Sequence, residues 1–220
     1  MRRACWTPLL LVPILLGFVL PAERILAELA KLHRKATPLR VEARLRGIGA
    51  DWPDRITLEL HPDLGQRVSD GRGGRWLIRH GHLLAGTGAR PPIWVPPIEL
   101  LVLREEADLR TWLHALRIPA LDNRLARCAA TDCFVIGGPS PSGELWLDKD
   151  RFEPLDLVWP DGRRVELRGY RDWQGRRFPS EISILDEHGA LATLTVERVS
   201  PTTLGDEEFS PRWVGPSSSR

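Results

Sequence analysis

Apolar and polar residues alternate with a period of two along much of the chain, most clearly between residues 145 and 185. Such alternation predicts strands with one buried face. Turn-forming triplets, such as Pro160-Asp161-Gly162 and Glu187-His188-Gly189, separate the alternating runs. Short turns between successive strands make neighbouring strands antiparallel, so this stretch predicts a meander within one sheet. Its inward-facing positions are Leu145, Leu147, Leu155, Leu157, Trp159, Val165 and Leu167.

The same period predicts strands in the first half of the chain. One run places Leu39, Val41, Ala43 and Leu45 on a single face, and the next places Ile56, Leu58 and Leu60 on a single face. Shorter strands are predicted around Val68, Trp76 and Leu83, and over residues 124–128 and 133–137. Counted together, these runs predict a sheet of about ten strands.

Two segments have helical spacing instead. Between Ala22 and Lys35, apolar residues recur on one helical face, and Pro38 ends the pattern. Residues 98–116 follow a Pro- and Gly-rich loop and predict two short helices, separated at residues 104–106. Strands with one apolar face and helices in two places predict an α+β fold. We expect a curved antiparallel half-barrel sheet whose concave face is covered by the N-terminal helix and the inserted helices, with room for an apolar ligand.

The N-terminus predicts a secretory signal peptide over residues 1–22. Arg2 and Arg3 precede an apolar run from Pro8 to Leu20, and a small residue, Ala22, follows. A membrane anchor is the alternative, but the run is shorter than the roughly 20 residues that a helix needs to cross a bilayer. The remainder predicts one domain over residues 23–205 and an irregular tail over residues 206–220.

Charge excludes one class of partner. The chain has 31 basic and 29 acidic residues, and removal of the signal peptide leaves 29 of each. A neutral balance gives no electrostatic attraction for nucleic acid. We therefore expect no nucleic-acid partner.

Cysteine usage is consistent with export. Cys5 would be lost with the signal peptide, which leaves Cys128 and Cys133. An even number of cysteines in an oxidising compartment predicts a disulfide, here across a hairpin tip. A zinc site would need two further ligands nearby, and a redox motif would have two residues between the cysteines rather than four.

Candidate catalytic and metal-binding patterns are weak. His80 and His82 could form a metal pair on a strand, but a third ligand is missing. Ser140 and Ser142 lie in a Pro/Gly loop without a nucleophile-elbow sequence. Asp148 and Asp150 flank a lysine in a tight turn, where carboxylates usually cap backbone amides. The sequence therefore predicts no enzyme, no metal site and no cofactor.

Several motifs, taken in order, resemble the LolA-like outer-membrane lipoprotein-sorting proteins. Residues 145–152, Leu-Trp-Leu-Asp-Lys-Asp-Arg-Phe, followed by Pro154, resemble the family's strand that ends in an Asp-Lys-Asp turn and a Phe-x-Pro. Tyr170, Gly175 and residues 178–182 resemble its next two strands, and residues 69–76 resemble an earlier hairpin. Two features depart from the family: residues 200–202 replace a usual Asn, and the arginine near the family's cavity cannot be assigned among Arg40, Arg44 and Arg46.

The resemblance implies a monomeric periplasmic carrier that shelters acyl chains of lipoproteins or lipids in an apolar cavity. It would shuttle them toward the outer membrane, between membrane-bound donor and acceptor proteins. A non-catalytic module for envelope interaction or sensing, with the same fold and a filled cavity, is the alternative. The residues predicted to line the cavity, chosen from alternation and position, are Leu45, Leu58, Trp76, Trp94, Ile98, Leu101, Leu113, Leu157 and Leu167.

Overall fold

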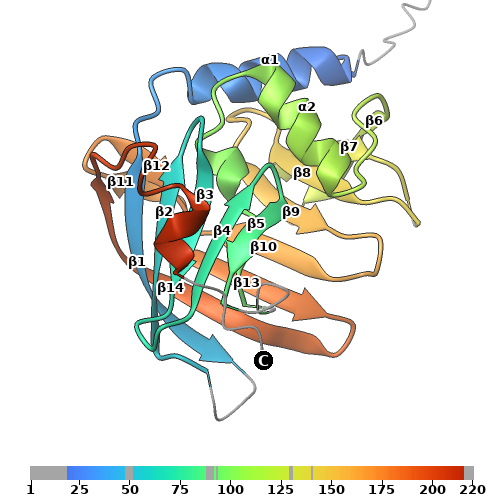
Figure 1. The fold of residues 1–220 in the computed structure, drawn as a ribbon. Coiled ribbons are helices and arrows are strands. Elements are labelled where there is room, and N and C mark those ends of the chain that lie inside the picture. Colours follow the sequence, from blue (N-terminus) through green and yellow to red (C-terminus); the bar gives the residue numbers. More distant parts are fainter. Residues whose placement is uncertain are drawn as a thin grey trace, which may run out of the picture.

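A single antiparallel sheet dominates the fold. The computed structural model describes residues 19–47, 52–87, 92, 94–128, 131–139 and 141–215. Over these residues, twelve strands form one open sheet in the order β5-β4-β3-β2-β1-β14-β13-β10-β9-β8-β7-β6, and β11 pairs with β12 in a separate hairpin. The sheet curves around a central interior (Figure 1). The α+β class and the antiparallel sheet are confirmed.

The strand count differs from the expected ten. The strands of the main sheet are β1 (Leu39–Gly47), β2 (Arg55–His61), β3 (Gly65–Ser69), β4 (Arg75–Arg79), β5 (His82–Gly86), β6 (Asn123–Cys128), β7 (Thr131–Gly137), β8 (Glu144–Asp148), β9 (Pro154–Val158), β10 (Arg164–Arg168), β13 (Glu181–Asp186) and β14 (Gly189–Pro201). The small hairpin is β11 (Arg171–Trp173) and β12 (Arg176–Phe178). The predicted runs correspond to β1–β10, including the edge strands β5, around Leu83, and β6, over residues 124–128, so the main sheet has β13 and β14 in addition.

The central pair β1–β14 shows how the alternation builds the interior. In β1, Leu39, Val41, Ala43 and Leu45 are buried, whereas Arg40 and Arg44 are exposed. Val41 lies opposite Val199 of β14 and Leu58 of β2. A register shift between Glu42 and Ala43 interrupts the β1–β14 ladder, as a bulge that bends a sheet does.

Aspartates at the hairpin turns cap backbone amides, as their sequence context predicts. Asp148 Oδ1 accepts hydrogen bonds from the amides of Asp150, at 3.0 Å, and Arg151, at 2.7 Å. Asp70 and Asp186 accept from backbone amides in their own turns in the same way. The Asp-Lys-Asp motif thus contains a turn-capping carboxylate.

The N-terminal helix is shorter than predicted. Helix α1 (Ala22–Leu32) buries Ile25, Leu26 and Leu29, but Leu32 is 52% exposed. Residues 33–35 form a turn. Leu20 packs on the core, and its carbonyl accepts a hydrogen bond from the Asn123 side chain. Most of the predicted signal peptide, residues 1–18, lies outside the described residues.

The insert, as we call residues 94–116 between β5 and β6, contains one α-helix rather than the two predicted. Its first part is a single 3-10 turn, η1 (Glu99–Leu101), and α2 spans Glu106–Ala115. Residues 98–103 are all buried. A segment that is surrounded by side chains on every side has no polar face, so the amphipathic spacing that predicts a helix does not apply to it.

The two α-helices contact each other across one end of the curved sheet, and the segment around η1 enters its interior (Figure 1). Buried residues of α1, η1 and α2 join the inner face of the strands in one core cluster. At the other terminus, η2 (Pro211–Val214) packs on β4 and β5, where Phe209 and Val214 bury Leu77.

Within the described residues, none of the helices combines the length and the apolar character that crossing a bilayer requires.

Candidate functional site

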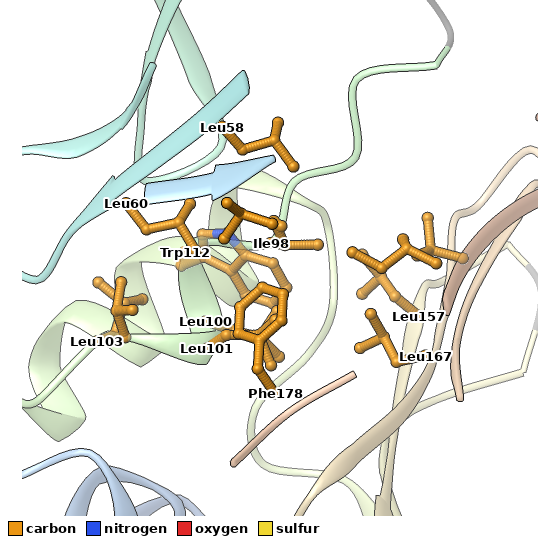
Figure 2. Packing of buried hydrophobic residues seen from close by; sticks show 14 of the residues in the cluster. Leu58, Leu60, Ile98, Leu100, Leu101, Leu103, Trp112, Leu157, Leu167 and Phe178 are labelled. Atoms are coloured by element: carbon orange, nitrogen blue, oxygen red, sulfur yellow. The ribbon is translucent and has the colours of Figure 1, made fainter. Parts of the chain in front are cut away.

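The structure brings the predicted cavity residues together in the core. All nine belong to one cluster, and none is more than 7% exposed. They occupy two facing walls and a segment between them. Leu58 lies on one side, Leu157 and Leu167 lie on the other, and Ile98 and Leu101 lie between (Figure 2). Side chains therefore occupy the space between the walls, and a ligand-binding role for these nine residues stays a prediction.

Aromatic residues form part of the same interior. The rings of Trp76 and Trp94 meet edge to face, with centroids 5.3 Å apart. Trp112 of α2 is fully buried near Ile98 and Leu100 (Figure 2). Trp76 belongs to β4, whereas Trp94 and Trp112 belong to the start of the insert and to α2. The insert therefore packs against the sheet through large apolar surfaces.

The insert is attached to the sheet by side chains. The backbone hydrogen bonds described for residues 94–103 are local, for example from Leu101 N–H to the carbonyl of Ile98. Gln66 of β3, fully buried, makes the connection: its Nε2 donates to the Pro96 carbonyl at 2.9 Å and its Oε1 accepts from the Ile98 amide at 3.1 Å. One side chain thus satisfies two buried polar groups of the insert.

Glu99 provides a second attachment. Its carboxylate accepts hydrogen bonds from the amides of His80, at 2.8 Å, and Gly81, at 2.7 Å, in the β4–β5 turn. Burial raises the pKa of this carboxyl to about 7, although the two amides favour the charged form. His80 Nε2 lies 3.6 Å from Asp108 of α2, so the same turn also contacts the second helix.

A cleft opens between the end of α1 and the β11–β12 hairpin. Its volume is about 380 Å³. Its floor consists of Leu39 and Leu101, which are also core residues, so the cleft borders the apolar interior. The other lining residues are Leu32, His33 and Lys35 from the α1 end, Arg151, Glu153 and Pro154 from the β8–β9 turn, and Tyr170, Gly175, Arg176 and Arg177 from the hairpin.

Two polar groups at this cleft are shielded from water. Burial lowers the pKa of His33 to about 4, an effect that the Leu103 backbone partly offsets, and His33 Nδ1 has no hydrogen-bond partner within the described part of the chain. The Tyr170 hydroxyl donates to the Pro154 carbonyl at 2.7 Å, and burial raises the pKa of this phenol well above its usual value. His33 is therefore neutral near neutral pH.

The remaining sequence candidates have structural places. The disulfide between Cys128 and Cys133 is present and joins β6 to β7, as predicted. His80 lies in the β4–β5 turn and contacts Asp108, and His82 begins β5. Ser140 lies outside the described residues. Among those that are described, no group of three or more metal-ligating side chains forms.

Sequence reasoning missed the polar residues of the site. The lining of the cleft comes from five separate segments, and no motif connects them. Of the two buried attachments, Glu99 alone is visible in the sequence, as a lone charge in the apolar run 98–103. Gln66 gave none, because a polar residue in a short strand is ordinary.

Comparison with known proteins identifies the class of fold. No protein-family profile matches the sequence, and no curated protein is significantly similar to it. A LolA superfamily protein from Nitrosomonas europaea superposes with a TM-score of 0.51 at 14% identity, covering 89% of this chain and all of that one. The chain therefore has a LolA-like fold, as the sequence resemblance implied.

A second solved structure is less similar. It is a candidate outer membrane lipoprotein-sorting protein domain from Vibrio parahaemolyticus, with a TM-score of 0.44 and 13% identity, covering 88% of this chain and 97% of that one. A TM-score this low carries no argument about function.

Proposed function

We propose that this protein is a periplasmic carrier that binds acyl chains of lipoproteins or lipids non-covalently and delivers them toward the outer membrane. One observation carries the proposal: the cleft floor, Leu39 and Leu101, is part of the apolar core beneath α1 and η1. An exposed methylene costs roughly 0.8 kcal/mol in water, so an acyl chain that crosses an aqueous compartment needs such a shelter. The LolA-like fold and the predicted signal peptide support the location.

The insert is the element that would move to admit the chain. Between residues 94 and 103, its described backbone forms no backbone–backbone hydrogen bonds with the sheet. Side chains attach it instead: Gln66, Glu99 and the ion pair of Arg104 with Asp63. Displacing it would break a few side-chain hydrogen bonds and leave the β-sheet ladder intact. The apolar surface that Ile98 and Leu101 give up would then be covered by the acyl chain.

The test is direct binding of 1-palmitoylglycerol, an uncharged single-chain lipid, followed by native mass spectrometry and tryptophan fluorescence. Leu101→Trp fills the cleft and should weaken binding at least about tenfold, which corresponds to 1.4 kcal/mol. Leu125→Trp on the edge strand β6, where Leu125 is 43% exposed, is the matched control and should bind normally. Absence of binding to the unaltered protein would refute the carrier.

A second function is favoured by the packing of the interior. Because all nine predicted cavity residues are buried against other side chains, the same fold could dock another envelope protein with its interior permanently filled. Protein purified from its own envelope distinguishes the two. Co-purified lipid or lipoprotein supports the carrier, and an empty protein held in a stable complex supports the docking module.

A further inference from the structure

The cleft beneath α1 carries more positive charge than its own structure neutralises. Lys35, Arg151, Arg176 and Arg177 line it, against a single carboxylate, Glu153. Glu153 is already occupied, because Arg177 donates to both of its oxygens, at 2.8 and 3.3 Å. Among the described residues, the other three cations form no ion pair. The positive charges of Lys35, Arg151 and Arg176 are therefore not balanced by a carboxylate of the described residues.

Arg176 is a partly buried cation whose hydrogen-bond acceptors are both neutral. It is half-buried, and its Nη2 donates to the Lys35 carbonyl at 2.8 Å and to Thr37 Oγ1 at 2.9 Å. Both acceptors are neutral, and burial lowers the pKa of the guanidinium. These two hydrogen bonds orient the guanidinium without compensating its charge, and a planar guanidinium matches the oxygens of a phosphate or carboxylate.

The opposite side of the cleft is apolar. Leu39 and Leu101 form the floor, and Leu32, half exposed at the end of α1, extends the apolar surface to the rim. His33 is neutral there, and its buried Nδ1 has no hydrogen-bond partner among the residues that the structure describes. Apolar floor and cationic rim thus meet within about 380 Å³, near the lower end of the roughly 300–1,000 Å³ of small-molecule sites.

We infer that this cleft binds an anionic amphiphile, with a single acyl chain over Leu39 and Leu101 and a phosphate or carboxylate headgroup among Lys35, Arg151 and Arg176. The inference rests on the proposed carrier function and refines it, because an uncharged acyl chain would leave the cations unused. Phosphate and carboxylate headgroups present the same oxygens to the guanidinium, so the shared chemistry is the anion.

Two lipids with the same chain test the headgroup: 1-palmitoyl lysophosphatidic acid and 1-palmitoylglycerol, titrated into the purified protein below their aggregation concentrations. We expect the phosphate-bearing lipid to bind about tenfold more tightly, a preference that shrinks as salt screens the charges. In Lys35→Gln/Arg151→Gln, this preference should be lost while binding of 1-palmitoylglycerol is kept.

The control variant removes two cations elsewhere. Arg34→Gln/Arg46→Gln changes the net charge equally, and neither residue lines the cleft. It should keep the full preference for the phosphate-bearing lipid. A comparable loss in the control would show that net charge alone attracts the lipid, which would overturn the site.

The outcomes separate this inference from the proposed function. Equal affinity for the two lipids would refute the headgroup site and leave the carrier standing. Failure of both lipids to bind would refute the carrier, and the headgroup inference with it. Inorganic phosphate or palmitate provides the third probe: palmitate binding that depends on Lys35 and Arg151 supports the shared anion chemistry, whereas phosphate alone binding as tightly as lysophosphatidic acid would overturn the amphiphile.

Discussion

Glu99 makes a quantitative prediction about stability and pH. Its carboxyl is fully buried in the insert, and burial raises its pKa from 4.5 to about 7. Below pH 4.5 the group is protonated in both the folded and the unfolded state. Between pH 4.5 and 7 the unfolded chain releases the proton first, so stability falls as pH rises and levels off above 7. Each pKa unit corresponds to about 1.4 kcal/mol, which gives a total loss of about 3 kcal/mol.

The perturbation is Glu99→Gln, which has no proton to lose over this range. Loss of a hydrogen bond to the His80 or Gly81 amide shifts its stability by an amount that does not depend on pH. The informative quantity is therefore the difference between variant and unaltered protein. Relative to the unaltered protein, the variant should gain about 3 kcal/mol between pH 4.5 and 8.

Urea unfolding followed by tryptophan fluorescence, repeated at half-unit pH steps, measures this difference. Glu105→Gln, six positions along the chain and exposed, controls for removing one carboxylate anywhere. A difference for Glu99→Gln that stays constant within about 1 kcal/mol across the range would refute the reasoning, because it would mean that Glu99 is solvated in the folded protein.

Three further predictions follow from other residues. His33 should act with the opposite sign: its pKa is lowered from 6.5 to about 4, so stability is lost as pH falls through this interval. The unaltered protein should lose about 3 kcal/mol relative to His33→Gln between pH 6.5 and 4, measured by the same unfolding assay. Gln66→Leu removes one hydrogen bond from the Pro96 carbonyl and one from the Ile98 amide, which keep only their mutual bond of 3.0 Å, and should cost about 2 kcal/mol. Hydrogen exchange at the Ile98 amide should accelerate more than exchange in β1, and equal protection would contradict the attachment. Reducing the disulfide, which closes a short loop, should lower stability by about 2 kcal/mol, measured by unfolding with and without reductant; an unchanged midpoint would contradict it.

The sheet could be predicted from sequence because its strands bury one face only, which makes apolar and polar residues alternate along the chain. β1 is the clearest case, with four buried apolar residues at alternate positions. The edge strand β6 could not be predicted as firmly, since both of its faces are partly exposed and either residue type is tolerated there. A strand can be predicted from alternation only where one of its faces is buried and the other is exposed.

The conformation of the insert and the position of the cleft could not be predicted from apolar and polar alternation. Residues 98–103 are all buried and, apart from Glu99, apolar, and that composition does not distinguish a helix from the observed 3-10 turn. The cleft depends on how the end of α1, at Lys35, meets a hairpin at Arg176, more than a hundred positions away. Such proximity depends on the tertiary structure, so it cannot be predicted from the local sequence of either segment.

The pairing of β1 with β14 has a consequence for how the chain reaches its folded state. β2–β5 on one side and β6–β10 on the other are built from hairpins of neighbouring strands, which form quickly because their contacts are local. The two halves are joined by pairing residues 39–47 with residues 192–201. A chain that emerges from its N-terminus must therefore keep the edge of β1 unpaired until nearly all of it has appeared. Throughout that interval, the exposed strand edge is open to mispairing and is a natural target for a chaperone.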